Sequence, residues 1–534
     1  MTMTDTAPAT GTNSEVVEAP NYNYGKLAEL VATGEHARIG RFFLGGGMLG
    51  LIGTLTVGLL LDLERTSPTK VEILDSDVLG QLISSHRLGL LLIGIIPALI
   101  GLAISVVPLQ VGARTIAFPR AAALGFWTWL MGTVLWLAGY LMGGGPGGGD
   151  LQGTDLWILG NIMVVGGLLV ATASVVTTVL GMRTTGMNLA RTPLFSFSML
   201  VAGSVWFITL PVLVANLVLV YIDHRYGQVL FGASEAIYAQ LAWLAGQPQI
   251  YAVAIPVLGI LGETVPVFAK ARSASNTLFQ VAISAFGLFA IGVWAQFSMS
   301  NVANPDATSL LKNPIYIAFG TLVVIPVLLA LALSAATIRA GKLNAKAPFI
   351  SALLAGLVLL AATVAGLLNV IEPLDLAGTT AALGHFNLVA GAAILGLVAG
   401  LWFWAPKIYG NMLAEGPGRL LGLVLALGAL LAGVGFVAGG FLEQPDSPNP
   451  GALKDGVDML NLVGVVGSAL LLLGVVGAAG AVLGSRRSKT SPGENPWDGH
   501  TLEWSTASPP VRGNFTETPE VSNESPLFSD REEA

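Results

Sequence analysis

Residues 378–405 read GTTAALGHFNLVAGAAILGLVAGLWFWA and contain no Asp, Glu, Lys or Arg. A helix needs roughly 20 apolar residues to cross a lipid bilayer, so this stretch predicts a transmembrane helix. Strands of a membrane barrel would alternate polar and apolar residues, whereas this stretch is continuously apolar. Lys407 is the first charged residue after the stretch and marks the predicted end of the span.

The same pattern recurs along the chain and predicts an all-α integral membrane protein with twelve transmembrane helices. Hydrophobic residues make up 53% of the 534 residues and charged residues 11%, whereas soluble domains carry about 25% charged residues. This composition excludes an ordinary soluble enzyme and a nucleic-acid binder, which needs clustered Lys and Arg. The predicted spans are 40–61, 86–109, 119–142, 154–181, 194–222, 236–266, 277–298, 314–338, 348–370, 378–405, 418–442 and 457–484.

The charges outside the spans predict the orientation of the chain. Lys and Arg concentrate in alternate loops, and basic residues of short loops stay on the cytoplasmic side of a membrane. We therefore predict that the N- and C-termini are both cytoplasmic. Residues 1–39 are expected to form a disordered N-terminal segment and residues 40–484 the twelve-span domain. Residues 485–534 are rich in Ser, Pro, Thr and Glu and are expected to form a mostly disordered cytoplasmic tail.

Five stretches, in the same order along the chain, resemble subunit I of the haem–copper oxidases, the catalytic subunit of cytochrome c oxidase. The resemblance implies a twelve-span fold in a bacterial plasma membrane and partners that are subunit II- or III-like membrane proteins. The stretches are IPALIGLAISVVPLQVGARTIAFPR (96–120), GMRTTGMNLARTPLFSFSMLVAGSVWFITLPVL (181–213), LAWLAGQPQIYAVAIPVLGILGETVPVFAK (241–270), GHFNLVAGAAILGLVAGLWFWAPKIYGNML (384–413) and NPWDGHTLEWSTASPPVRGNF (495–515).

The haem ligands that the resemblance implies are only partly present. The two ligands of the family's low-spin haem match His86 and Asn387, and an amide is a poor ligand for iron. The ligand of the high-spin haem matches His385. Two residues apart on a helix point about 200° apart, so positions 385 and 387 would serve different haems.

The positions of the family's copper ligands match Gln247, Gln296 and Phe297. Copper favours imidazole, so we predict that copper is not bound. Tyr251 keeps the family's Tyr position, and Gln249 replaces the Glu at the top of a proton channel. The sequence GFLEQPDSPNPG (440–451) has no counterpart of the Arg pair that grips the haem propionates in the family.

Glu263 is an acidic residue inside a predicted span, where an ionisable group is costly unless it is paired, protonated or hydrated. It is either a residual proton or ion site or an intramembrane polar contact. The alternative to haem ligation is an interfacial polar role for His86 and a hydrogen bond to a neighbouring helix for His385. We expect the remaining histidines, which are His36, His224 and His500, to be solvated.

Taken with the resemblance, these substitutions predict a catalytically degenerate homologue of haem–copper oxidase subunit I. It would be a haem-binding or scaffold subunit of a membrane electron-transfer complex, with one or two haems and no copper. Two alternatives stay open. One is an active terminal cytochrome c oxidase subunit that reduces dioxygen, and the other is a haem-free structural subunit of a membrane complex.

Overall fold

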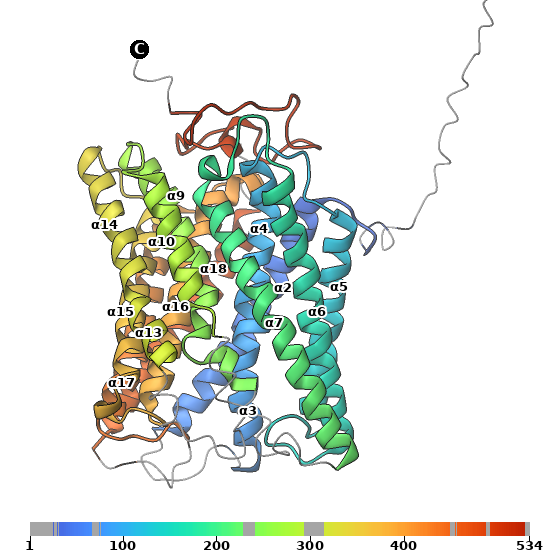
Figure 1. The fold of residues 1–534 in the computed structure, drawn as a ribbon, viewed down its shortest axis with the longest axis vertical. Coiled ribbons are helices and arrows are strands. Elements are labelled where there is room, and N and C mark those ends of the chain that lie inside the picture. Colours follow the sequence, from blue (N-terminus) through green and yellow to red (C-terminus); the bar gives the residue numbers. More distant parts are fainter. Residues whose placement is uncertain are drawn as a thin grey trace, which may run out of the picture.

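The computed structural model describes residues 31–66, 76–227, 241–292, 314–448, 456–486 and 492–528, together with the isolated positions Gly25, Glu29, Leu74 and Lys454. Within these residues the chain is a bundle of long helices that run roughly parallel to one another (Figure 1). The only β contact among them is an isolated bridge between Thr379 and Pro445. The prediction of an all-α membrane fold is confirmed by this architecture.

Eleven helices in the described residues are long and apolar enough to cross a membrane. Their segments are α2 (His36–Glu64), α3 (Ser76–Gly89) continued by η1 (Leu90–Ile95) and α4 (Ile96–Gln110), α5 (Pro119–Leu141), α6 (Leu151–Gly181), α7 (Leu194–Tyr226), η4 (Gln249–Ala254) continued by α9 (Ile255–Ala269), α13 (Pro314–Leu322) with α14 (Val324–Ala340), α15 (Ala347–Asn369), α16 (Thr380–Tyr409), α17 (Glu415–Phe441) and α18 (Asp458–Ser485).

The span predicted at 277–298 is represented by α10 (Asn276–Phe289), a shorter apolar helix. The rest of that span lies outside the described residues. The start of α2 and residues 509–514 line one cavity, so the two ends of the described chain lie at the same face of the bundle. An even number of crossings fits that placement, but the count of twelve stays a prediction.

Three spans form the centre of the bundle, because their most apolar windows are almost entirely buried. They are Val78–Gln110, Gln249–Ala269 and Thr380–Tyr409. Other spans, such as α5, α7 and α18, leave leucines and valines exposed on their outer sides, as helices that face lipid do. His86 and His385, the predicted haem ligands, lie on two of these central spans.

Glycines set the close packing of α5 against α6. Gly125, Gly132 and Gly139 recur every seven residues on α5 and lie against the α6 backbone. A Cβ atom on Gly132 would lie 2.6 Å from the backbone nitrogen of Val164, so no larger residue fits there without a shift. Small residues let membrane helices approach in this way, and the fit replaces the hydrophobic effect as a driving force in lipid.

Residues 492–528 cover one end of the bundle, which we call the tail face (Figure 1). The expectation of a mostly disordered tail is wrong for this segment. Trp504 is 1% exposed, and Asn514 Nδ2 donates a hydrogen bond of 2.8 Å to the carbonyl oxygen of Ala113. Val521 N donates to the carbonyl oxygen of Thr185 over 3.1 Å. The segment lacks long helices but is anchored by individual buried side chains and backbone hydrogen bonds.

Candidate functional site

His86 lies at the end of α3, with its ring against α2. Its Nδ1 atom is 2.8 Å from the carbonyl oxygen of Thr54. A Cβ atom on Gly58 would lie 2.6 Å from the same Nδ1, so the ring fits only because position 58 is glycine. Asn387 and His86 line the same small cavity, as their predicted roles require, but that cavity has a volume of only about 10 Å³.

His385 of α16 meets Tyr251 of η4 directly. Its Nε2 atom lies 2.9 Å from the Tyr251 hydroxyl oxygen, and the two ring centroids are 5.2 Å apart. Both side chains are buried, with 3% and 0% exposure. The structure thus brings two of the predicted site residues together, and they contact each other through a hydrogen bond.

Gln247 completes this cluster. Its Nε2 donates a hydrogen bond of 2.9 Å to the carbonyl oxygen of Gly366 in α15. A Cβ atom on Gly366 would lie 3.0 Å from His385 Nε2 and 3.2 Å from Gln247 Nε2. The side chains of Gln247, Tyr251 and His385 therefore converge on one glycine and fill the space between η4, α15 and α16.

The other positions that match copper ligands or a proton-channel residue of the family are Gln249, Gln296 and Phe297. Gln249 is 1% exposed, and its Oε1 accepts a hydrogen bond of 2.7 Å from the backbone nitrogen of Gly292. This hydrogen bond connects η4 to the residues just after α10, so the Gln249 side chain has a structural role. Gln296 and Phe297 lie outside the described residues.

The residues present do not fit the haem that the fold family implies. Ligand pockets have volumes of roughly 300–1,000 Å³, whereas the cavity beside His86 holds about 10 Å³. At the second position the Tyr251 hydroxyl occupies the His385 nitrogen that faces η4. Copper does not fit either, because two amides and a phenyl ring stand at the three imidazole positions that the resemblance implies. The described residues contain no group of three or more His, Cys, Asp or Glu that could hold a metal ion.

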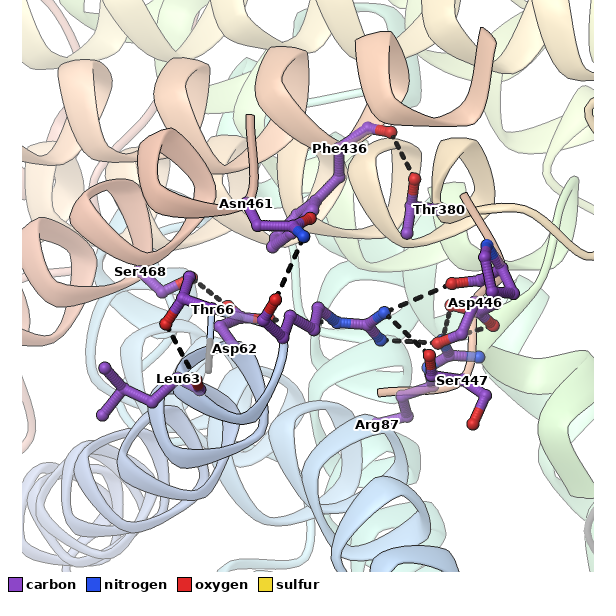
Figure 2. Close-up of polar contacts among 12 residues, drawn as sticks. Asp62, Leu63, Thr66, Arg87, Thr380, Phe436, Asp446, Ser447, Asn461 and Ser468 are labelled. Carbon is purple, nitrogen blue, oxygen red and sulfur yellow. Dashed lines mark hydrogen bonds and ion pairs between the residues drawn. The ribbon is translucent and has the colours of Figure 1, made fainter. Parts of the chain in front are cut away.

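A polar network joins the ends of α2 and α3 to the loop after α17 (Figure 2). These elements lie at the end of the bundle opposite the tail face (Figure 1). We call this polar network the Asp446 network, and it consists of Asp62, Arg65, Arg87, Asp446 and Ser468. Both carboxylate oxygens of Asp446 accept hydrogen bonds of 2.7 Å from Arg87 Nη2. Arg65 Nη2 donates to the backbone oxygen of Asp446, and Ser468 Oγ donates to Asp62, each over 2.5 Å.

The sequence indicated only that the loop after α17 lacks the family's arginines. The structure adds that this loop supplies an acid instead, and that the arginines come from the ends of α2 and α3. The position of Asp446 beside Arg87 could not be read from spacing, because 359 residues separate them. The only available signal was the absence of that arginine pair from residues 440–451.

Glu263 is 7% exposed in α9 and lies near a second carboxylate, Glu503 of the tail. Its Oε1 accepts a hydrogen bond of 3.2 Å from the backbone nitrogen of Phe195. Glu503 Oε1 accepts from Gln110 Nε2 over 3.0 Å and from Trp404 Nε1 over 3.1 Å. Burial raises the pKa of Glu503.

The hydrogen bonds of Glu503 anchor the tail, because they join it to α4 and α16. Sequence reasoning singled out Glu263 but missed Glu503, which stands in an otherwise polar segment. It also missed the burial of two histidines. His36 and His500 are each only 7% exposed, so the expectation that they are solvated is wrong.

Comparisons with known proteins agree with this architecture. The profile of the family described as "Cytochrome C and Quinol oxidase polypeptide I" matches residues 38–470. The "Probable cytochrome c oxidase subunit 1-beta" of Nocardia farcinica is 29% identical and covers 91% of this chain and 84% of its own length. The "Cytochrome c oxidase subunit 1" of Bacillus subtilis is 26% identical, with coverages of 95% and 83%.

A solved structure of a haem–copper terminal oxidase dimer shares the fold, with a TM-score of 0.66 and 16% sequence identity over 85% of this chain and 84% of the other. Subunit I homologues are multi-pass proteins of the plasma membrane, and members of the family bind haem and copper and associate with other membrane subunits. The long family match and the shared fold together establish that this chain belongs to the cytochrome c and quinol oxidase polypeptide I family.

Proposed function

We propose that this chain is a haem-free structural subunit of a membrane complex, which keeps the helical bundle of oxidase subunit I without its redox centres. The observation that carries the proposal is the 2.9 Å hydrogen bond between His385 Nε2 and the Tyr251 hydroxyl. An imidazole that ligates a metal needs one free nitrogen, and the nitrogen that faces η4, Nε2, already has a protein partner.

The surroundings of His86 support the same proposal. The ring lies against Gly58, and the neighbouring cavity of about 10 Å³ has room for one water molecule at most. Asn387 stands where a second haem ligand would be expected. The Asp446 network adds a further argument, because Arg87 already has a carboxylate partner within the chain and does not need a haem propionate to balance its charge.

The haem content of the protein tests this proposal. We expect protein purified from its native membrane to give no pyridine haemochrome spectrum. Finding about one haem per chain would overturn the proposal and favour the haem-binding alternative. His86→Ala and His385→Ala would then identify the ligand, and His224→Ala serves as a control because His224 lies outside both candidate sites.

Copper content and dioxygen uptake test the alternative of an active oxidase. The proposal predicts far less than one copper per chain and no dioxygen uptake with reduced cytochrome c. Copper near one atom per chain together with turnover would establish the active oxidase instead.

We further propose that the tail face is cytoplasmic, in keeping with the distribution of Lys and Arg. The chain has no cysteine, so single cysteines can be introduced without background. A membrane-impermeant maleimide should label Glu443→Cys in intact cells, but Glu517→Cys only after the cells are permeabilised. The opposite pattern would reverse the orientation.

The partners proposed for this subunit are subunit II- or III-like membrane proteins. Purification from native membranes in a mild detergent should therefore recover additional membrane proteins in fixed ratio with this chain. An unrelated tagged membrane protein from the same cells provides the control. Recovery of this chain alone, as a single well-defined species, would contradict a structural role in a complex.

A further inference from the structure

A cavity of about 800 Å³ lies at the tail face, where no predicted site residue is located. Its walls come from the start of α2, the end of α4 and the loop after it, the end of α16 and residues 509–514 of the tail. The volume lies within the range of roughly 300–1,000 Å³ that is typical of ligand sites. The cavity is thus large enough for a small molecule or a lipid headgroup.

The charged residues that line this cavity are mostly basic. Arg41 comes from α2, Arg114 from the loop after α4, Arg512 from the tail and Lys407 from the last turn of α16. Glu35 is the one acid among the described lining residues, and it pairs with Arg38 over 3.3 Å. The cavity therefore carries an excess of positive charge.

Lys407 already has partners, because its Nζ atom donates to the carbonyl oxygens of Glu494 and Thr506 over 2.8 and 2.5 Å. The three arginines are different. Within the described residues Arg41, Arg114 and Arg512 form no side-chain hydrogen bond and no ion pair. Three unpaired guanidinium groups from three separate segments face one cavity, and an anion bound there would satisfy all of them at once.

We propose that this cavity binds a phosphate-bearing anion, held by Arg41, Arg114 and Arg512. A guanidinium group matches the geometry of phosphate oxygens with two parallel hydrogen bonds, and a phosphate offers several oxygens to several arginines. Ile408 and Val511 add an apolar wall beside the charges. The phosphate could belong to an anionic phospholipid or to a soluble phosphate compound, and the experiment separates these sources. The proposal is independent of the haem content of the protein.

The test compares the protein with the triple variant Arg41→Gln, Arg114→Gln, Arg512→Gln. A matched control removes three other basic side chains of the tail face that do not line the cavity, Arg120→Gln, Arg339→Gln, Lys342→Gln. Phospholipid binding is measured by native mass spectrometry after exchange into nanodiscs with phosphatidylglycerol or with phosphatidylcholine alone. Binding of soluble phosphate is measured by calorimetric titration with inorganic phosphate and with pyrophosphate.

We expect the parent protein and the control to bind one of the two classes of probe. The triple variant should lose at least about tenfold in affinity, because each lost charge-assisted hydrogen bond alone accounts for roughly that factor. Retention of phosphatidylglycerol alone would identify a lipid site, and binding of pyrophosphate would identify a soluble ligand. Binding of neither class, or equal binding by the triple variant, would overturn the proposal. Size-exclusion profiles and melting temperatures verify that the variants are folded.

Discussion

The contact between Tyr251 and His385 is the residue-scale basis of the proposed haem-free role. Both side chains are fully surrounded by protein, so neither can exchange its partner for bulk water. A buried polar atom without a partner costs about 1–3 kcal/mol. The bond therefore stabilises the packing of η4 against α16.

Tyr251→Phe removes the hydroxyl group and leaves His385 Nε2 without this partner. We expect the variant to be less stable than the parent by about 1–3 kcal/mol, measured by thermal or denaturant unfolding in detergent. Tyr221→Phe is a matched control, because no hydrogen bond of the Tyr221 hydroxyl is found in the described residues. Equal stability of both variants would show that the contact with His385 contributes little.

Because the carboxyl group of Glu503 is buried, we expect the docking of the tail on the bundle to depend on pH. Burial raises its pKa above the ordinary value, so the docked tail binds the proton more tightly than a released tail does. Docking is therefore strongest at pH values below the ordinary pKa of Glu and weakens as the pH rises through the raised pKa. Hydrogen exchange of residues 500–506, corrected for intrinsic rates, should show less protection at pH 8 than at pH 5.5.

Glu503→Gln keeps the hydrogen-bond geometry but cannot ionise. Its exchange protection should depend less on pH than that of the parent, whereas Glu517→Gln, an exposed tail position, should behave like the parent. If Glu503→Gln retained the full pH dependence, another group would control docking of the tail.

Two kinds of contact hold neighbouring helices together. One is close packing at glycines, and the other is buried polar networks. The α5–α6 pair shows the first kind. Gly160 of α6 lies so close to α5 that an added Cβ would meet the backbone nitrogen of Trp136 at 2.5 Å. Gly166 of the same helix has no heavy atom within 4 Å of the corresponding position.

Gly160→Val should therefore destabilise the bundle, by about 1–3 kcal/mol or more, because the helices must separate. Gly166→Val should have little effect, since its side chain would point into open space. Melting temperatures in one detergent compare the two variants directly. A similar loss of stability in both variants would mean that the valine substitution itself, and not the close approach of α5, causes the destabilisation.

The Asp446 network joins the ends of α2 and α3 to the loop after α17 (Figure 2). Asp446→Asn removes the charge opposite Arg87 but keeps the backbone carbonyl that binds Arg65. The Arg87 and Asp446 side chains are 18% and 26% exposed, so we expect a modest loss of about 1 kcal/mol. Glu443→Gln, which breaks the exposed pair with Lys454, should change stability by less than the Asp446 variant in the same unfolding assay.

At the scale of the whole molecule, long apolar segments made the helices predictable, because the requirement to cross a bilayer leaves a strong local signal. The predicted span 378–405 became α16, Thr380–Tyr409, and the predicted span 86–109 lies within the long helical span Val78–Gln110. The contact of His385 with Tyr251 was not predictable, because 134 residues separate them and no local pattern encodes it. The tail was misjudged because its composition is polar, while a few buried residues such as Glu503 and Trp504 determine its order.

The most direct test of the account is an experimental structure of the protein isolated from its native membrane, with the separation of His385 Nε2 and the Tyr251 hydroxyl oxygen as the measured quantity. We predict a separation near 2.9 Å, with no density between the two side chains. Planar density of a porphyrin next to His385, with Tyr251 displaced from hydrogen-bond distance, would contradict the haem-free account.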